Sequence, residues 1–334
     1  MNLLVTGGSG FIGSRLTNRL LQEGHVVRVF DKTINPALAG LTIQADVRRA
    51  EEVVRACAGA DVIFHLAAEH RDDVTPASLY DEVNVVGTRN VLAAAERSRC
   101  RQVVFTSSVA VYPLNARSPD ESFPTAPFNR YGQSKAEAER LIAQWAQADA
   151  KRSATILRLC VTFGEGNRGN VYNLLRQIAA GRFVMMGSGQ NRKSMAYVGN
   201  VVEFLVSCLG DGPGVHLYNY ADKPDLSTRE IVAIARAEIG CQDGLLSRLS
   251  LPYPIALGLG YAADLVARVS GRKLPVSSIR VRKFCAETTV AAERVARRGF
   301  VRPFTLEEGL RRTIAHEFKC GPAGRRIARI AVSS

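Results

Sequence analysis

The sequence predicts an α/β protein in which a doubly wound parallel sheet is followed by a smaller α+β lobe. Three observations support this fold class. A glycine-rich turn separates a first strand from a first helix at the start of the chain. Strand-like and helix-like segments alternate through the first half, as expected of a parallel sheet covered on both faces. Beyond about residue 165 the alternation loosens, which indicates a second lobe.

The glycine-rich turn reads Gly7-x-x-Gly10-x-x-Gly13, between a strand over 2–6 and a helix over 11–23 that stops at Gly24. Gly7 permits a tight turn, Gly10 lets a phosphate approach the backbone, and Gly13 lets the helix pack on the strand. Backbone N–H groups and the helix dipole at such a turn bind a dinucleotide pyrophosphate. This pattern predicts a Rossmann domain.

Asp31 lies 18 residues after Gly13, at the end of a second strand over 25–30. A carboxylate there accepts hydrogen bonds from the adenosine ribose hydroxyls and repels a 2′-phosphate, so it favours NAD over NADP. Lys32 beside it weakens this argument. The alternative interpretation of Asp31 is a solvated surface carboxylate.

The remaining elements follow in order. Further strands are expected near 41–45, 61–66, 102–107 and 154–160, and further helices near 49–57, 76–98, 130–148 and 170–181. We expect an NAD-binding domain over 1–165, to which part of 197–222 returns, and a substrate lobe over 166–334 with a basic C-terminal segment. In that lobe, Ser227-x-x-Glu230 and Thr305-x-x-Glu308 have the spacing of capping boxes that start helices. A cleft between two lobes is where a substrate is expected.

Composition restricts the surroundings and partners of the protein. The seven cysteines are scattered without a C-x-x-C pair, which predicts reduced thiols, no metal site and a cytoplasmic location. The start of the chain has no signal-peptide pattern. The net charge is +13, and residues 268–334 carry 16 Lys and Arg against 5 Asp and Glu. This basic segment suggests a phosphate-bearing substrate or an anionic membrane surface, or simply a solvated face; without a nucleic-acid motif, nucleic acid is the least expected partner.

The candidate catalytic residues are Ser108, Tyr131 and Lys135. Tyr131 and Lys135 are four residues apart, so they share one face of a helix. Free tyrosine has a pKa of about 10, and a neighbouring ammonium group favours its phenolate. Such a tyrosine can take a proton from a substrate hydroxyl while hydride leaves the same carbon. Ser108, at the end of a strand, can hold the substrate oxygen; the alternative for the Tyr-Lys pair is an ordinary exposed helix face.

Together these features resemble the extended short-chain dehydrogenase/reductase family, which contains NAD-dependent sugar epimerases and dehydratases. The resemblance covers nearly the whole chain, and its further marks are Asp46-Val47, His65-Leu66-Ala67-Ala68, Asn84-Val85-Val86-Gly87-Thr88 and Ser107-Ser108-Val109-Ala110-Val111-Tyr112. The family's catalytic Ser/Thr lies four residues before that tyrosine, which selects Ser108. The resemblance implies a homodimer through helices near 80–98 and 131–148. It implies cofactor contacts at Gly7, Gly10, Phe11, Ile12, Gly13, Asp31, Lys32, Asp46, Val47, Leu66, Ala67, Ala68, Asn84, Tyr131, Lys135 and Cys160.

Departures from the family pattern narrow the reaction. Dehydratases of the family carry Asp-Glu directly after the catalytic Ser/Thr, and decarboxylating members keep a Glu at the second of these positions. This chain has Val109-Ala110. The resemblance therefore implies epimerisation without elimination, and a 4-keto reductase, which usually consumes NADPH, is disfavoured by Asp31.

The substrate motifs also depart from those of nucleotide-sugar epimerases. Val161 replaces their Asn, Pro113 replaces a Gly, and Lys193 replaces the Asp that follows Arg192, itself the expected pyrophosphate ligand. Four runs, at 68–74, 166–175, 193–200 and 282–286, instead resemble bacterial 4-epimerases that act on undecaprenyl-diphosphate-linked N-acetylglucosamine for O-antigen synthesis. The candidate substrate contacts are His70, Arg71, Ser108, Arg168, Asn170 and Arg192. A soluble UDP-sugar epimerase, or a non-catalytic NAD-binding protein on the same fold, are the alternatives.

A lipid-linked substrate requires approach to the inner face of the membrane. Residues 254–269 are apolar but too short and too charged to span a bilayer, and Arg272, Lys273, Arg280, Arg282 and Lys283 follow. This composition is typical of an interfacial segment on anionic lipid. The alternative is a core helix beside a solvated basic edge. The basic tail at 325–330 is either a lipid contact or a disordered end.

Overall fold

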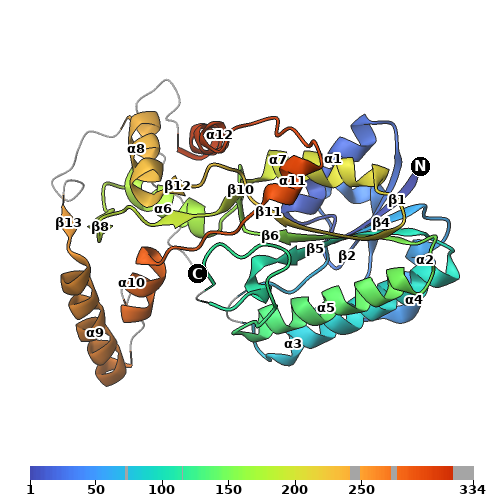
Figure 1. The fold of residues 1–334 in the computed structure, drawn as a ribbon, viewed down its shortest axis with the longest axis horizontal. Helices are drawn as coiled ribbons and strands as arrows, with labels where there is room; N and C mark the ends of the chain where they lie inside the picture. Colours follow the sequence, from blue (N-terminus) through green and yellow to red (C-terminus); the bar gives the residue numbers. More distant parts are fainter. Residues whose placement is uncertain (72–73, 115, 241–248, 272–276, 319–334) are drawn as a thin grey trace. The chain divides into compact units, whose positions relative to one another are not determined.

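The computed structural model describes residues 1–71, 74–114, 116–240, 249–271 and 277–318. The chain forms two compact units (Figure 1). The first comprises residues 1–162, 198–222 and 290–303, and the second comprises 163–197, 223–289 and the described residues from 304 onward. Residues 290–303 thus return to the first unit after the chain has built most of the second.

The first unit is built on a seven-stranded sheet in which every strand pairing is parallel. Its strands are β1 (Asn2–Thr6), β2 (Val26–Asp31), β3 (Thr42–Gln44), β4 (Val62–His65), β5 (Gln102–Ser108), β6 (Ser153–Leu159) and β11 (Gly214–Tyr220). The spatial order β11-β6-β5-β4-β1-β2-β3 reverses direction between β1 and β4. In open parallel sheets, ligands bind at the carboxyl ends of the strands beside such a switch point. The doubly wound sheet expected from the sequence is confirmed, and its first six strands end within one residue of the expected bounds.

Helices cover both faces of this sheet (Figure 1). On one face α1 (Phe11–Gln22) packs against α7 (Val198–Ser207), and on the other α2 (Ala50–Cys57), α4 (Gly87–Arg97) and α5 (Arg130–Gln147) pack in sequence. The strands between these layers are almost continuously buried, which explains their apolar sequences. Short elements complete the unit: η1 (Pro36–Leu41), η3 (Val109–Val111), β7 (Val161–Phe163, at its boundary), η4 (Cys208–Gly210) and α11 (Glu293–Arg297).

The helix expected over 76–98 is interrupted by a π-helical turn. It consists of α3 (Ser78–Tyr80), the π segment η2 (Asp81–Val86) and α4. A π turn holds one residue more than an α turn, so it changes which side chains face inward. It buries Asn84 and presents Gly87 to Val47, whose Cγ2 lies only 2.8 Å from where a Cβ at Gly87 would stand. Helical periodicity in the sequence does not reveal this insertion.

The second unit is a smaller α+β assembly. Its helices are α6 (Asn170–Ala179), α8 (Thr228–Ile239), α9 (Tyr253–Ser270), α10 (Ser278–Cys285) and α12 (Leu306–Phe318), and its strands are β8 (Met185–Met186), β9 (Arg192–Lys193), β10 (Met195–Tyr197), β12 (Leu226–Ser227) and β13 (Ser250–Leu251). Helix α8 packs against both α6 and α12. Both expected capping boxes are present: Ser227 and Glu230 exchange hydrogen bonds at the start of α8, and Thr305 and Glu308 do so before α12.

Candidate active site

The glycine-rich turn joins β1 to α1 and can be built only from small residues. Gly7 has φ +70°, and a Cβ there would stand 2.7 Å from the amide nitrogen of Ala67. A Cβ at Gly13 would stand 2.2 Å from the carbonyl oxygen of Gly7. Gly10 is the N-cap of α1, and no side chain of the described residues caps this end of the helix. The first N–H groups of α1, including those of Phe11 and Ile12, therefore offer an anion site that fits a pyrophosphate.

Asp31 is the last residue of β2 and is held by the same turn. Its Oδ2 accepts a hydrogen bond from Ser9 N at 3.0 Å, and its Oδ1 accepts one from Thr33 N at 2.9 Å. Oδ1 also accepts a hydrogen bond from the Thr33 hydroxyl group at 3.0 Å, so Oδ2 is the oxygen with a further acceptor position for a ribose hydroxyl group. The structure therefore carries a cradle and a carboxylate that suit NAD.

The other expected adenine-side residues lie at the ends of neighbouring strands. Asp46 forms an ion pair with Arg48 at 2.7 Å, and this interaction lowers the pKa of the Asp46 carboxyl group. Val47 is buried against Gly87. The exposed Lys32 lies 3.8 Å from Glu69. Asp46 and Lys32 thus already face partners within the chain.

A hydrogen-bonded chain connects the turn after β4 to the π segment. Ala67 N donates to Thr6 Oγ1 at 3.3 Å, and Thr6 Oγ1 lies 2.7 Å from His65 Nδ1. His65 Nε2 lies 3.0 Å from Thr88 Oγ1, which donates to the Asn84 carbonyl oxygen at 2.6 Å. Because the single Thr88 proton goes to Asn84, His65 must donate through Nε2 and accept from Thr6 through Nδ1. Burial lowers the pKa of His65 to about 3, in keeping with a neutral ring.

Asn84 acts as a brace between two parts of the site. Its amide donates to Glu69 O at 3.0 Å and to Ser134 Oγ at 2.9 Å, and its Oδ1 accepts from Glu69 N at 2.8 Å. Ser134 in turn donates to the carbonyl oxygen of Tyr131 at 2.8 Å. Asn84 is 2% exposed, and these bonds make it a support for Glu69 and the start of α5; its expected contact with the cofactor stays a prediction.

The three candidate catalytic residues come from two elements that pack together. Ser108 ends β5, and its Oγ accepts a hydrogen bond from Ala110 N at 3.2 Å. Tyr131 and Lys135 occupy the first two turns of α5, whose N-cap is Asn129. Gly132 makes the close approach possible, since a Cβ there would stand 2.2 Å from the Ala110 carbonyl oxygen. The sheet thus presents the serine where α5 presents the tyrosine and the lysine.

Lys135 is a buried cation. Its Nζ donates to the carbonyl oxygen of Thr106 at 2.8 Å and lies 4.5 Å from the centre of the Phe105 ring. The side chain is almost fully buried, and this desolvation lowers the pKa of Lys135 to about 7. Lys135 lies one turn after Tyr131 on α5, as the four-residue spacing predicts.

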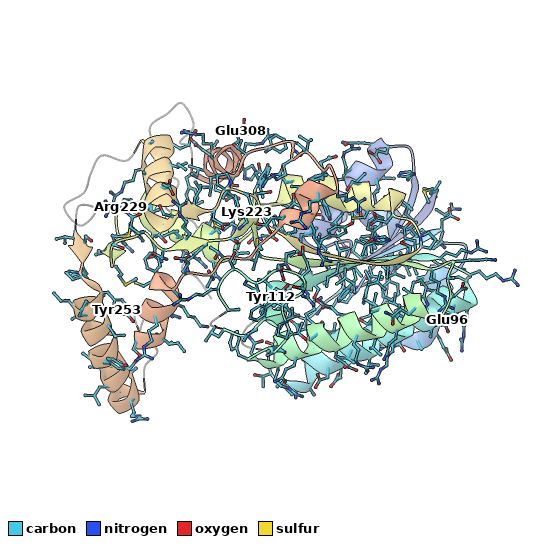
Figure 2. All side chains as sticks on the ribbon, in the orientation of Figure 1. Glu96, Tyr112, Lys223, Arg229, Tyr253 and Glu308 are labelled. Carbon is cyan, nitrogen blue, oxygen red and sulfur yellow. The ribbon has the colours of Figure 1, made fainter. Side chains whose placement is uncertain are left out.

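A network of buried polar side chains adjoins Ser108 and Lys135, and none of its members was among the site residues expected from the sequence. Glu139, one turn beyond Lys135, accepts from Ser107 Oγ at 2.5 Å and forms an ion pair with Arg158 at 2.7 Å. Arg158 also donates to Tyr112 Oη at 2.8 Å, and Tyr112 lies 2.8 Å from Asn219 Oδ1. Tyr112 is labelled in Figure 2. One feature of the sequence indicates this network: Glu139 follows Lys135 by four residues, as Lys135 follows Tyr131, so all three lie along one face of α5.

The expected substrate residues are divided between the two units. His70 and Arg71 are exposed in the first unit, and Arg71 lies 3.5 Å from Glu69. Cys160, which was expected to contact the cofactor, is buried directly after β6. In the second unit, exposed Asn170 begins α6, and Arg168 pairs with Glu317 and lies over the Tyr172 ring. Arg192 bonds to the Asp225 carbonyl oxygen and lies 3.5 Å from Glu230. Both arginines, expected to bind phosphate, have partners within the chain in this structure.

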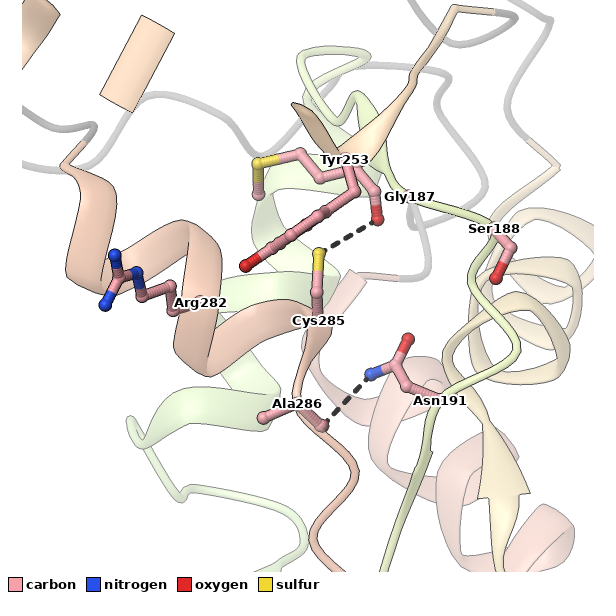
Figure 3. Close-up of a pocket in the computed structure, with 8 residues that line it drawn as sticks. Gly187, Ser188, Asn191, Tyr253, Arg282, Cys285 and Ala286 are labelled. Carbon is pink, nitrogen blue, oxygen red and sulfur yellow. Dashed lines mark hydrogen bonds between the residues drawn. The ribbon is translucent and has the colours of Figure 1, made fainter. Parts of the chain in front are cut away.

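The second unit contains a pocket of about 540 Å³ (Figure 3). None of the substrate residues expected from the sequence lines it. It is lined by Met186, Gly187, Ser188, Asn191, Tyr253, Arg282, Cys285 and Ala286. Cys285 donates to the carbonyl oxygen of Met186 at 3.3 Å, which ties α10 to β8. Arg282 is the cation of this lining. The run at 282–286, noted in the sequence only for its resemblance to other epimerases, contributes Arg282, Cys285 and Ala286 to this lining.

Fold and site define an NAD-dependent protein of the short-chain dehydrogenase/reductase type with a Ser-Tyr-Lys set. Residues 3–221 match the model of the NAD dependent epimerase/dehydratase family, and the chain belongs to that family. It is 48% identical, over 95% of both chains, to the N-acetyl-alpha-D-glucosaminyl-diphospho-ditrans,octacis-undecaprenol 4-epimerase of Escherichia coli O157:H7. A UDP-glucose 4-epimerase of Vibrio cholerae is 28% identical over 69% of this chain and 74% of its own.

Solved structures show the same fold. MoeE5 in complex with UDP-glucose and NAD superposes with a TM-score of 0.74 at 24% identity, covering 95% of this chain and 98% of its own. The UDP-glucose 4-epimerase of Thermus thermophilus in complex with NAD gives 0.71 at 22% identity with the same coverage. The cofactor expected from Asp31 and the glycine-rich turn, NAD, is confirmed by the family.

Proposed function

We propose that this protein is the C4 epimerase of N-acetylglucosamine carried on undecaprenyl diphosphate, which it converts to the N-acetylgalactosamine form for surface polysaccharide synthesis. The observation that carries the proposal is the junction of β5 and α5, where Ser108, Tyr131 and Lys135 are set without an acid at positions 109 and 110. A site without that acid can oxidise and reduce a sugar carbon but lacks the group needed to eliminate water.

The chain's own residues supply proton transfer and orientation. Tyr131 takes the proton of the C4 hydroxyl, and protonated Lys135 stabilises the phenolate that this step requires. Ser108 holds the sugar oxygen. Bound NAD would supply the hydride acceptor and donor for C4 and would be regenerated in each turnover. Between these steps the 4-keto sugar turns over, and Tyr131 returns the proton.

The lipid carrier is supported by sequence similarity over nearly the whole chain and by the altered substrate motif. The E. coli relative named for an undecaprenol-linked substrate matches 95% of this chain, whereas the V. cholerae UDP-glucose 4-epimerase matches 69%. Lys193 stands where nucleotide-sugar epimerases carry an acid, and it caps α10 beside the pocket. We assign Arg282 to the diphosphate because it lines the pocket, with Arg168 and Arg192 as further candidates; all three have partners within the chain that the diphosphate would replace.

The proposal also includes an oligomeric state and a location in the cell. One is a homodimer through α4 and α5, as in the family that the sequence resembles. The other is a peripheral position at the inner face of the cell membrane. Among the described residues, no helix is long and apolar enough to cross a bilayer.

The experiment is a C4-epimerisation assay with N-acetylglucosamine on undecaprenyl diphosphate and on UDP, side by side. Conversion of the lipid-linked sugar alone supports the proposal. Conversion of the UDP-sugar alone assigns the protein to soluble nucleotide-sugar metabolism. If neither carrier is turned over while NAD still binds, the protein is a non-catalytic binding protein on this fold.

A further inference from the structure

Helix α9 exposes an apolar surface of a kind that other helices of the protein bury. Ile255, Leu259, Tyr261, Leu265 and Val266 of α9, and Ile279 of α10, are each between 50% and 63% exposed. Among the large side chains that α9 exposes, Arg268 is the only charged one. On α5, a helix of equal length, every exposed residue is polar: Arg130, Gln133, Arg140, Gln144 and Gln147. A surface helix normally follows the pattern of α5.

The opposite face of α9 is occupied by α10. Gly260 lies where the helices meet, since a Cβ there would stand 2.8 Å from the Cα of Ser278. Asp264 accepts a hydrogen bond from Ser278 N at 3.1 Å, at the start of α10. Ala256 and Val281 are each at most 2% exposed. The exposed apolar face is therefore the outer surface of a packed helical hairpin.

The hairpin is anchored to the body of the second unit by Asn191 and Lys193. Lys193 Nζ donates to the carbonyl oxygens of Lys283 and Ala286, both at 3.0 Å, at the end of α10. Asn191 Nδ2 donates to the Phe284 carbonyl oxygen at 2.9 Å. These bonds satisfy C-terminal carbonyls of α10 and place a cation at the negative end of its dipole. They attach the hairpin to the strand segment that lines the pocket.

Positive charge borders the apolar face. Of the described residues within 253–286, Arg268, Arg280, Arg282 and Lys283 are basic and exposed, and the one acid, Asp264, already caps α10. Arg272 and Lys273, which the sequence analysis counted with them, lie outside the described residues. Arg282 lies over the ring of Tyr261, 5.6 Å from its centre, and donates to its hydroxyl group. Apolar side chains beside arginines and an amphipathic tyrosine match the boundary between acyl chains and anionic headgroups.

We propose that the outer face of the α9–α10 hairpin docks onto an anionic lipid bilayer. A second copy of the chain is a poorer occupant, because a two-fold interface would bring this basic surface against itself. The proposal rests on the proposed function in one respect: the hairpin that meets the bilayer also supplies Tyr253, Arg282, Cys285 and Ala286 to the pocket. A diphosphate anchored in the membrane would thus reach the pocket at the docked surface.

The test is co-sedimentation of the full-length protein with vesicles of phosphatidylethanolamine and phosphatidylglycerol, and with vesicles of phosphatidylcholine alone. The Leu259→Glu/Leu265→Glu variant should bind the anionic vesicles at least tenfold more weakly than the wild type. A matched control is Val26→Glu/Val301→Glu, which places the same charges at exposed apolar positions of the first unit and should bind normally. Circular dichroism verifies that both variants are folded.

The electrostatic contribution is tested separately with Arg268→Gln/Arg280→Gln. At low salt, loss of two cations near the surface should weaken binding about 30-fold, which corresponds to about 2 kcal/mol at about 1 kcal/mol per cation. Binding should also weaken as salt is raised.

Three results would overturn the docking proposal: wild-type protein that does not bind anionic vesicles, a Leu259/Leu265 variant that binds like its control, or a variant that loses vesicle binding only because its oligomeric state has changed.

The proposed function is tested by a different measurement, the turnover of N-acetylglucosamine linked through diphosphate to a short water-soluble prenol. The hairpin variant should retain that turnover. If the wild type lacks it while vesicle binding persists, docking stands and the epimerase assignment fails.

Discussion

The carboxylate of Glu139 and the guanidinium of Arg158 form a two-pronged ion pair in the interior of the first unit. Nε of Arg158 lies 3.0 Å from Oε1 and Nη2 lies 2.7 Å from Oε2, and both residues are less than 8% exposed. Burial by itself lowers the pKa of Arg158, but the bonds to Glu139 outweigh it and the pKa is raised. Since Glu139 also holds Ser107, the pair joins α5 to the strand end that carries Ser108.

Removing one partner of this pair should destabilise the protein strongly. Glu139→Gln leaves Arg158 charged and buried without its counter-charge, which typically costs about 3–5 kcal/mol. Urea unfolding measures the loss. Glu137→Gln, which removes a half-buried carboxylate paired with Arg140 on the same helix, is the matched control and should cost about 1 kcal/mol or less. Equal losses in the two variants would show that the buried pair is not a structural support.

Glu139→Gln should also shift the pH dependence of turnover. The charge of Glu139 raises the pKa of Lys135, against the larger effect of burial, which lowers it to about 7. Without Glu139 that pKa falls further, so Lys135 loses its proton at lower pH and the alkaline decline of kcat moves to lower pH. An unchanged pH profile in folded Glu139→Gln would confine the residue to a structural role.

Tyr131→Phe should remove turnover and leave NAD binding intact. The substitution deletes the hydroxyl group that takes the substrate proton, and general acid–base catalysis is worth roughly 10²–10⁴-fold. The rate of epimerisation and the NAD dissociation constant measure the two effects. Tyr218→Phe, a hydroxyl deletion elsewhere in the same unit, is the control. Residual activity within tenfold of the wild type would exclude Tyr131 as the base.

His65 should make the protein sensitive to acid. Its pKa is about 3 in the folded state against an ordinary value of 6.5, so the unfolded chain binds the proton more readily between these two values. The free energy of unfolding therefore falls as pH is lowered from about 6.5 to 3, by about 1.4 kcal/mol per pH unit from this group. Between pH 6.5 and 5, His65→Gln should lose about 2 kcal/mol less than the wild type. Parallel pH dependences in urea unfolding would refute this.

Lys193→Asp should loosen the α9–α10 hairpin. The substitution restores the acid of nucleotide-sugar epimerases, but it places a carboxylate against the carbonyl end of α10, where the helix dipole is negative. Hydrogen exchange of α10 amides should accelerate at least tenfold, while amides of α8 stay unchanged. Lys193→Met separates the lost cap from the added negative charge, and its effect should be smaller. Unaltered exchange in both variants would contradict the anchoring role.

Much of the first unit was predictable because its signals are local. The glycine spacing, the carboxylate at the end of β2 and the Tyr-Lys spacing each depend on residues a few positions apart, and the family resemblance is the basis for proposing Ser108. The π turn at Asp81–Val86 was not predictable, because one inserted residue changes a helical face without changing its composition. The return of residues 290–303 depends on contacts with β11 that have no local signature.

The sequence by itself determined the class of fold and the cofactor, since these follow from short-range patterns, and it supplied the residues proposed to perform the chemistry. Only the tertiary structure decided which charges are paired and which surfaces are exposed. Arg168 and Arg192 look alike in sequence as phosphate ligands, yet each has a partner from a distant segment. The apolar stretch of α9 is compatible with a core helix, and only folding shows that its face points outward. Burial and pairing are set by residues far apart along the chain.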